Sequence, residues 1–238
     1  MDAINNQKES GFTLVEISMG MIIIGLLIGG IFGGMALIEN MKVNSTVQQI
    51  KKFESAALNF KQTYGYLPGD LANPTSVLSN CAAPCDLSGN QDGKVTSNGW
   101  NAWNALLSWN SEETAFWHHL AAANMVEGII PDGGTGIVMG THIPLSPFET
   151  GYGLTYNGIA GTGVRGSQIV LANSPYTTAL GGTTANDLVI PGSAAQKLDE
   201  KIDNGDRYTG KFLAWNGLPI GPPYDITTNY GVRYLYNF

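Results

Sequence analysis

The sequence predicts an α+β fold in which one long N-terminal helix packs on a globular domain with an antiparallel β-sheet. Three observations lead to this prediction. An apolar run covers the 27 residues from Phe12 to Ile38 and continues as an amphipathic pattern to Tyr64, without a proline. From Ile129 onward, short apolar segments alternate with glycines, as in antiparallel strands. Most of the 31 glycines lie in the second half of the chain, among many Thr, Asn and Tyr residues.

Length and charge limit the class of protein. The chain has 238 residues, and residues 65–238 are enough for one globular domain with its own core. Lys and Arg number 12 against 19 Asp and Glu, for a net charge of −7. A general nucleic-acid-binding protein needs a basic face to neutralise phosphates, so this class is disfavoured.

The apolar run is long enough to cross a membrane. At about 1.5 Å per residue it reaches about 40 Å, more than the roughly 30 Å of a bilayer core. It exceeds the apolar region of a signal peptide, although Gly34-Met35-Ala36 offers a weak cleavage site. A plain single-pass anchor is the other alternative. Glu16 is the one ionisable residue of the run, and such residues in membrane helices are candidates for function, unless Glu16 simply lies at headgroup level.

The second half of the predicted helix has one apolar stripe. Its members are spaced three or four residues apart, as expected for one face of a helix that packs on its own domain: Val43, Val47, Ile50, Phe53, Ala57, Phe60 and Tyr64. Gly65 is a helix stop signal and Pro68 follows it. We therefore divide the helix, 12–64, into a transmembrane or filament-core part, 12–38, and an amphipathic part, 39–64.

The stretch GFTLVEISMGMIII at the start of this helix resembles the processing and methylation segment of type IV pilins and of type II secretion pseudopilins. The resemblance implies that residues 1–11 form a prepilin leader ending in Gly11. A prepilin peptidase and N-methyltransferase would cut after Gly11 and methylate Phe12. It also places Glu16 at the position of the family's assembly glutamate. The implied fold is type IV pilin-like.

The same resemblance implies a function. The protein would be a structural subunit of a type IV pilus or pseudopilus, held in the inner membrane with a periplasmic globular domain before it enters a filament. Its partners would be other pilin subunits and an inner-membrane assembly platform. Glu16 would neutralise the new amine of Phe12 on a neighbouring subunit, because a buried unpaired charge is costly. The alternative is a membrane-anchored or secreted protein with a binding role. No hydrolase, zinc-protease or phosphate-loop motif predicts an enzyme.

The two cysteines, Cys81 and Cys85, occur in CAAPC. A closed zinc site needs two further ligands, and no Cys or His lies nearby in the sequence. Outside the cytoplasm a small disulfide ring is the favoured interpretation. A pair of buried or free thiols is the alternative, because spacing alone does not fix the geometry.

The segment that follows resembles the start of a calcium-binding loop. Oxygen-bearing side chains alternate, then a glycine and an aliphatic residue follow, and the candidate ligands are Asp86, Ser88, Asn90 and Asp92. The pattern departs from the calcium loop at Ser88, where Asp is expected, and at Gly99, where Glu is expected. A polar turn stabilised by Asn and Asp is the favoured interpretation, with Ca²⁺ as the alternative.

Two short helices are predicted in the globular part. SEETAFWHHLAAANMVEG begins with Ser111 as a cap. Its adjacent His118 and His119 point about 100° apart on a helix, so we expect one packed and one exposed. SAAQKLDEKIDNG is the second helix, with Ser193 and Gln196 as a predicted capping box.

Overall fold

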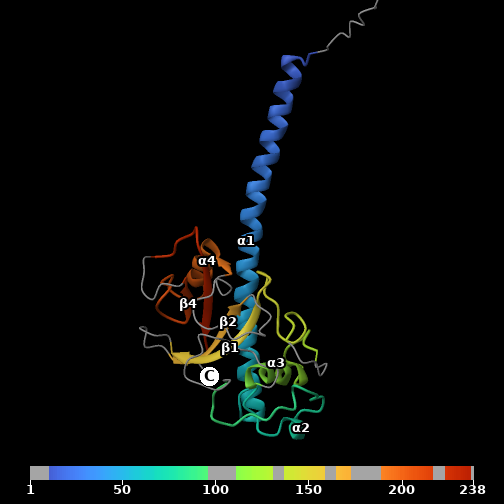
Figure 1. Ribbon diagram of the computed structural model, residues 1–238, viewed down its shortest axis with the longest axis vertical. Coiled ribbons are helices and arrows are strands. Elements are labelled where there is room, and N and C mark those ends of the chain that lie inside the picture. Colours follow the sequence, from blue (N-terminus) through green and yellow to red (C-terminus); the bar gives the residue numbers. More distant parts are fainter. Residues whose placement is uncertain are drawn as a thin grey trace, which may run out of the picture. The chain divides into compact units, whose positions relative to one another are not determined.

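The computed structural model describes residues 11–95, 111–130, 137–158, 165–172, 189–216 and 223–236. Residues 1–10 of the predicted leader lie outside this part. Contacts divide the chain into two compact units, residues 1–41 and 42–238. In chain order, the elements are α1 (Leu14–Tyr64), α2 (Pro74–Val77), α3 (Glu112–Ala122), β1 (Gly151–Gly158), β2 (Arg165–Ala172), β3 (Ile190–Pro191), α4 (Gly192–Ile202), β4 (Phe212–Trp215) and β5 (Asn229–Leu235), and Figure 1 shows the ribbon that they form.

Helix α1 is continuous over 51 residues, as the absence of proline predicts. It ends at Tyr64 because Gly65 has a φ of +82°, a left-handed conformation that favours glycine. In the first unit, the large apolar side chains of α1 from Leu14 to Met41 are exposed. This half of the helix has an apolar surface and no covering layer among the described residues.

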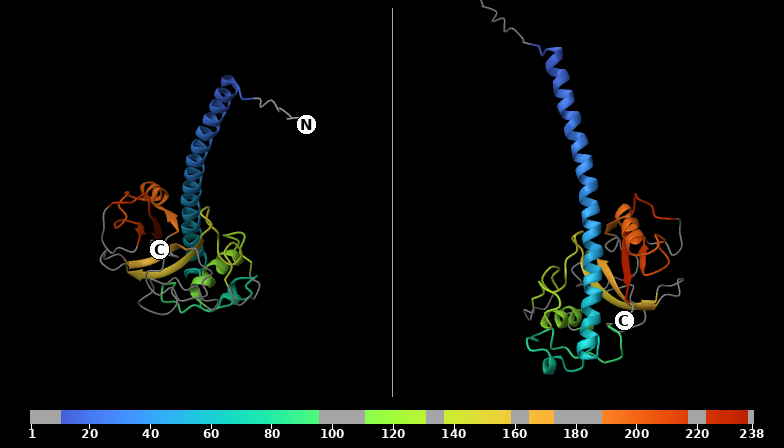
Figure 2. Two further views of the ribbon diagram at one scale, coloured as in Figure 1. Left: turned by 45° about the horizontal axis from the view of Figure 1, so that its top comes forward. Right: turned by 180° about the vertical axis from the view of Figure 1, so that it is seen from behind.

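In the second unit, α1 supplies one wall of the hydrophobic core. The predicted stripe is buried from Val43 to Phe60. Phe53 packs edge-on against Trp117 of α3 and Tyr152 of β1, with ring centroids 4.9 and 5.0 Å away. Figure 2 shows the last turns of α1 beside α3 and the sheet from two further directions. Burying each such aromatic ring contributes roughly 2 kcal/mol.

Hydrogen bonds also join α1 to the sheet in this unit. The Tyr152 hydroxyl donates to Gln49 Oε1 at 2.6 Å, and the Tyr234 hydroxyl donates to Glu54 Oε2 at 2.8 Å. Both bonds link residues far apart in the sequence. The second half of α1 is therefore part of the globular domain.

The sheet is antiparallel throughout its described pairings, as predicted. β1 pairs with β2, and β5 pairs with β2, β3 and β4. Tyr230, Val232 and Tyr234 of β5 are buried at alternate positions, which is the period of a strand with one face on a core. α4 packs beside β3, β4 and β5. The long N-terminal helix followed by this domain is consistent with the pilin-like α+β fold.

Two local predictions, both of helix caps, have different outcomes. Ser111 caps α3 as predicted, accepting a hydrogen bond from the Thr114 N–H. The capping box at α4 is wrong, because the helix begins at Gly192 after Pro191. Ser193 therefore lies inside α4, and Gln196 donates to Glu200 Oε1 at 2.9 Å instead.

Candidate functional site

The start of α1 is defined by a reciprocal set of hydrogen bonds. The N–H and hydroxyl of Thr13 both donate to Glu16 Oε2 at 2.9 Å, and the Glu16 N–H donates to Thr13 Oγ1 at 3.3 Å. This is a capping box, in which each side chain satisfies a donor of the first turn. Because the helix begins at Leu14, the peptide bond between Gly11 and Phe12 lies outside it.

Both residues flanking that bond are accessible. The Phe12 side chain is 83% exposed, and a Cβ added at Gly11 would meet no atom within 4 Å. The capping box and this exposure together give an uncovered peptide directly before the helix. Such a segment has the accessibility that a peptidase needs.

An open groove of about 360 Å³ runs along the first turns of α1. It is lined by Phe12, Glu16, Ile17, Gly20, Met21 and Ile24. Counted from Phe12, the other lining residues lie 4, 5, 8, 9 and 12 positions further along, so they share one side of the helix. The groove therefore combines one carboxylate with an otherwise apolar wall.

The helix carrying this groove is, by length and composition, long and apolar enough to cross a membrane, and no other helix of the described residues is. Glu16 lies near the beginning of this apolar segment.

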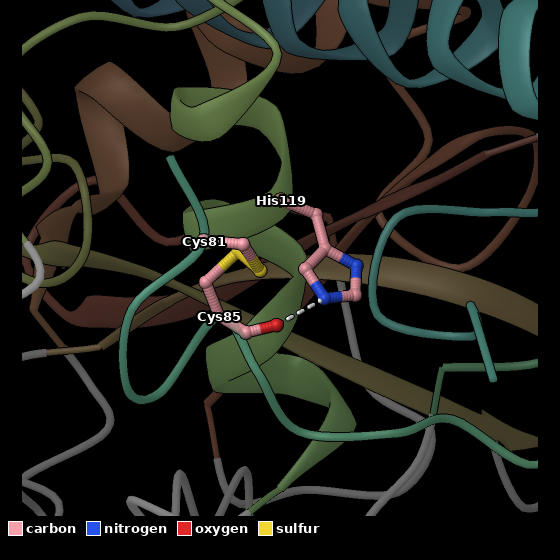
Figure 3. A group of neighbouring side chains, drawn as sticks. All are labelled: Cys81, Cys85 and His119. Atoms are coloured by element: carbon pink, nitrogen blue, oxygen red, sulfur yellow. Dashed lines mark hydrogen bonds between the residues drawn. A yellow bond between two sulfur atoms is a disulfide. The ribbon is translucent and has the colours of Figure 1, made fainter. Parts of the chain in front are cut away.

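In the described part of the globular domain, one group of side chains of the types that bind metal ions lies close together. It is formed by Cys81, Cys85 and His119 (Figure 3). The cysteines are joined by a disulfide with Cα atoms 5.0 Å apart. His119 Nδ1 accepts a hydrogen bond from the Gly69 N–H at 2.8 Å. Its Nε2 must therefore carry the proton, and it donates to the Cys85 carbonyl at 2.9 Å. The two sulfurs are bonded to each other, and both ring nitrogens of His119 form hydrogen bonds. The group therefore has a structural role in holding these segments together.

The environment of His119 fixes its charge. The ring is fully buried and stacks on Phe60 of α1 with centroids 6.0 Å apart. Burial lowers the pKa of His119 to about 4, and the nearby His118 adds to the lowering. His119 is therefore neutral at pH 7, and it links α1, α3 and the disulfide loop.

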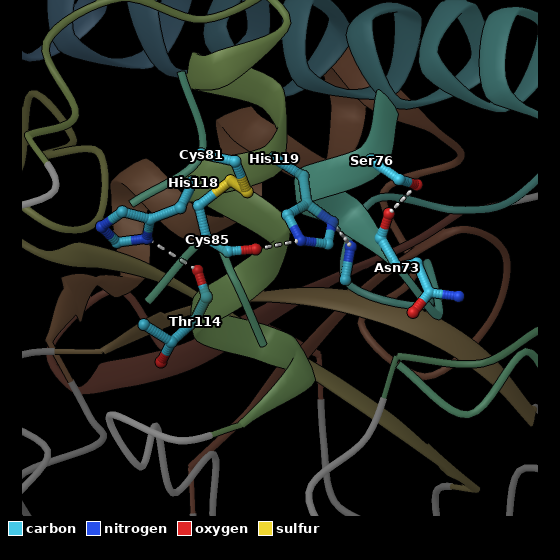
Figure 4. Close-up of a disulfide and its surroundings, with 8 residues drawn as sticks. Asn73, Ser76, Cys81, Cys85, Thr114, His118 and His119 are labelled. Carbon is cyan, nitrogen blue, oxygen red and sulfur yellow. Dashed lines mark hydrogen bonds between the residues drawn. A yellow bond between two sulfur atoms is a disulfide. The ribbon is translucent and has the colours of Figure 1, made fainter. Parts of the chain in front are cut away.

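The expectation that one of the adjacent histidines is exposed is wrong. His118 and His119 are both buried, with 1% and 0% of their surface exposed. Figure 4 shows why: His118 Nδ1 contacts the Thr114 carbonyl at 2.9 Å on one side of α3, and His119 faces the disulfide on the other. α3 is covered on both of these sides, which the helical spacing of the two residues did not reveal.

The predicted calcium ligands lie on an exposed loop: Asp86, Ser88, Asn90 and Asp92. Asn90 Oδ1 accepts from the Asp92 N–H and Asp92 Oδ1 accepts from the Lys94 N–H, both at 2.9 Å. These bonds are the ones expected of a polar turn. Calcium binding stays a prediction.

A further carboxylate supports the same loop. Asp70 is 1% exposed, and its two oxygens accept from the N–H groups of Asp92 and Gly93 at 3.2 and 2.9 Å. Burial raises the pKa of Asp70, against the lowering effect of these bonds. Sequence reasoning missed this residue because it lies more than 20 positions before its partners.

Comparison with known proteins finds one match, at the N-terminus. Residues 6–32 match the family model of the prokaryotic N-terminal methylation motif, which is the cleavage and methylation signal of type IV prepilins and pseudopilins. No curated protein and no solved structure matches the chain. The matched residues include Gly11, Phe12, Glu16 and the whole groove. Motif and apolar helix together support a type IV pilin-like protein, a structural class.

Proposed function

We propose that this protein is a structural subunit of a type IV pilus or of a related pseudopilus. The observation that carries the proposal is the continuity of two features. The methylation motif at residues 6–32 runs directly into a helix whose apolar side chains are exposed as far as Met41. An exposed apolar helix of this length needs a bilayer or other helices around it. A filament subunit uses each of these environments in turn.

Processing is the first step of the proposed function. A prepilin peptidase cuts the peptide bond between Gly11 and Phe12, and an N-methyltransferase modifies the new amine of Phe12. The exposure of Phe12 and the start of α1 two residues later support this assignment. If this peptide bond lay inside the helix, the helix would have to unwind there before a protease could cut the bond.

Assembly is the second step. Cleavage creates a cation at Phe12, and packing of α1 among other helices removes that cation from water. Glu16 is the one acidic group on the groove beside it, so its carboxylate is the available counter-charge within the motif. We assign Glu16 to pair with the amine of a neighbouring subunit and so to fix the step between subunits.

Localisation follows from the same proposal. Before assembly, α1 anchors the subunit in the inner membrane beside an assembly platform, and residues 42–238 lie in the periplasm. The disulfide between Cys81 and Cys85 supports an oxidising compartment for the domain. After assembly, the subunit belongs to a filament with other pilin subunits at the cell surface. An enzymatic role has no support in the motif.

Mass spectrometry of the N-terminus of the mature protein tests the proposal. We expect a chain that begins at Phe12 and carries a methylated amine. A chain cut near Ala36, or not cut at all, would instead support a secreted or simply anchored protein. Electron microscopy of filaments from cells lacking the protein then separates two roles: loss of all filaments indicates a shaft or priming subunit, and normal filaments indicate an accessory one.

Calcium binding at residues 86–92 is a separate proposal. Asn90 and Asp92 keep oxygen atoms at the loop surface, and the buried Asp70 holds the backbone of the loop in place. Thermal unfolding of the purified protein with calcium and with a chelator tests it. A rise in Tm with calcium that is lost in Asp92→Asn supports the site, and equal Tm values contradict it.

A further inference from the structure

We propose that the exposed side of the second half of α1 binds an acidic loop surface on a second copy of this chain. This side, the polar helix face, is formed by Asn44, Gln48, Lys51, Lys52, Ser55 and Asn59, which are all exposed. The acidic loop surface is formed by Asp86, Asp92 and Glu112. The inference rests on the proposed function, since it needs copies to assemble, and it names two surfaces that meet outside the apolar part of the helix.

The polar helix face covers an arc of about 100° on the side of α1 opposite its buried stripe. In the right-hand view of Figure 2, this half of α1 runs along the outside of the domain. The face carries two lysines and no carboxylate, whereas a helix face that meets only water commonly mixes the two signs. With the other described residues, neither Lys51 nor Lys52 forms an ion pair, a hydrogen bond or a ring contact. The positive charge of the face is therefore not neutralised by these residues.

Negative charge is concentrated in another part of the domain. Residues 65–130 hold six carboxylates and one lysine, a net charge of −5. Asp86 and Asp92 are exposed on the loop, and Glu112 Oε1 accepts a hydrogen bond from the Asn90 N–H at 3.0 Å. This bond brings a third carboxylate to the loop. The domain thus has a positive surface on α1 and a negative surface on the loop, and the two are complementary in charge.

The loop that carries these carboxylates is held in one shape. The Gly89 N–H donates to the Leu71 carbonyl at 2.9 Å, and a Cβ added at Gly89 would lie 2.4 Å from the backbone of Asp70. The Asp70 carboxylate accepts from the N–H groups of Asp92 and Gly93. A loop fixed in this way loses little conformational freedom on binding, so its charges are already placed for a partner.

The two surfaces of one chain cannot meet each other. The loop follows Cys85, whose carbonyl accepts from His119, and His119 stacks on Phe60 at the buried side of α1. Lys51 and Lys52 lie on the opposite side, eight or more residues earlier, which is at least about 12 Å along the helix. Pairing of the two surfaces therefore needs a second copy. A contact between two different surfaces of identical chains repeats into a ring or a filament, as the proposed function requires.

The contact sets orientation more than it supplies affinity. Exposed ion pairs are weak one at a time, but complementary charges determine which way two partners face each other. In the proposed filament, the exposed apolar half of α1 holds the copies together. The polar helix face then selects the neighbouring copy whose acidic loop surface is turned toward it.

Charge reversal tests the proposal in whole cells that express the full chain. The variant Lys51→Glu, Lys52→Glu makes the polar helix face negative. The variant Lys61→Glu, Lys201→Glu is the matched control, because it makes the same change in charge at two exposed lysines outside this face. We measure cleavage by N-terminal mass spectrometry, and assembly as the fraction of cleaved subunit in sheared filaments. We expect normal cleavage in both variants and a loss of about tenfold or more in assembly for the first alone, because the same repulsion recurs at every contact along a filament.

A charge exchange makes the test specific. The variant Asp86→Lys, Asp92→Asn removes the negative charge of the loop, and the asparagine keeps an oxygen that accepts from the Lys94 N–H. This variant should also assemble poorly. Its combination with Lys51→Glu, Lys52→Glu should assemble several-fold better than either double variant, because the two surfaces are again opposite in charge.

Crosslinking identifies the occupant of the polar helix face directly. A photoreactive benzoylphenylalanine in place of Ser55 lies within this face and should crosslink to residues 86–92 of a second copy. Crosslinks to lipid or to another part of the chain, wild-type assembly in Lys51→Glu, Lys52→Glu, equal losses in the control, or no gain in the combined variant would each overturn the contact. Failure of the wild-type chain to be cut after Gly11 or to enter filaments would instead overturn the proposed function.

Discussion

Glu16 takes part in two kinds of interaction that differ in how they depend on charge. Its bonds to Thr13 need an acceptor oxygen, which glutamine also supplies. Its proposed pairing with the amine of a neighbouring Phe12 needs a negative charge. The two roles can therefore be separated by the choice of substitution at this one position.

We predict that Glu16→Val leaves cleavage after Gly11 largely intact but impairs assembly, because the amine of a packed neighbour loses its counter-charge. Glu16→Gln keeps the capping box and should be equally defective. N-terminal mass spectrometry measures cleavage, and the subunit content of sheared filaments measures assembly. Normal incorporation of either variant would contradict the pairing.

His119 makes the stability of the globular domain depend on pH. Its pKa is about 4 in the folded protein, against an ordinary value of 6.5. The unfolded chain therefore binds the proton more readily. The stabilisation is fully present above pH 6.5, falls as the pH drops from 6.5 to 4, and changes no further below 4. The shift corresponds to about 3 kcal/mol across that window.

The measurement is urea unfolding of the full chain in detergent at pH 7 and pH 4.5, for wild type and for His119→Phe. We expect the variant to be less stable at pH 7, since two buried hydrogen bonds are lost. We also expect it to lose less stability than wild type on acidification. Burial raises the pKa of Asp70 and Asp199, and these groups act in the opposite direction in both proteins. Equal pH dependence of the two proteins would be evidence against the role of His119.

At the scale of elements, periodic patterns were the most reliable guide. The spacing of Val43 to Phe60 and the absence of proline predicted α1, its buried stripe and its end at Tyr64. Strong periodicity sustained over many residues leaves little choice of structure.

The sequence could not predict which elements meet. His119 lies 34 positions from Cys85, so its place beside the disulfide depends on how the loop folds onto α3. Both faces of α3 are covered for the same reason, and the histidine prediction failed there. The predicted cap at Ser193 failed because Pro191 and Gly192 already start α4. Of the site itself, the motif indicated Gly11, Phe12 and Glu16. The groove could be described only with the helix in three dimensions.

The disulfide closes a small ring inside the connection between α2 and α3, with a sequence separation of 4. Chain-entropy arguments give about 2 kcal/mol for so short a loop. We predict that the double variant Cys81→Ser, Cys85→Ser loses about this much stability but stays folded, because the buried cluster includes Cys85 but is otherwise formed by residues that the substitutions leave unchanged. Urea unfolding with and without reductant checks it: reductant should weaken wild type and leave the variant unchanged. A fully unfolded variant would show that the disulfide is essential for folding.

At the scale of the whole molecule, the chain separates exposed apolar surface from buried core. The exposed apolar side chains of α1 belong to residues 1–41, whereas the cluster of buried hydrophobic residues begins at Val43. This separation suits the proposed subunit, whose first part would leave a bilayer for a filament while the second part keeps its fold. It requires residues 42–238 to be stable without the apolar half of α1.

We therefore predict that a chain beginning at Lys42 is soluble without detergent, monomeric and cooperatively folded. The remaining part of α1 is held by Phe53, by Phe60 and by the hydrogen bonds of Tyr152 and Tyr234, all of which lie within residues 42–238. Sedimentation measures the oligomeric state, and circular dichroism during thermal unfolding measures cooperativity. The matched control begins at Phe12, keeps the exposed apolar residues, and should sediment as aggregate unless detergent is present. A shortened chain that unfolds without a transition, or that aggregates like the control, would mean that the apolar half of α1 is needed for folding as well as for assembly.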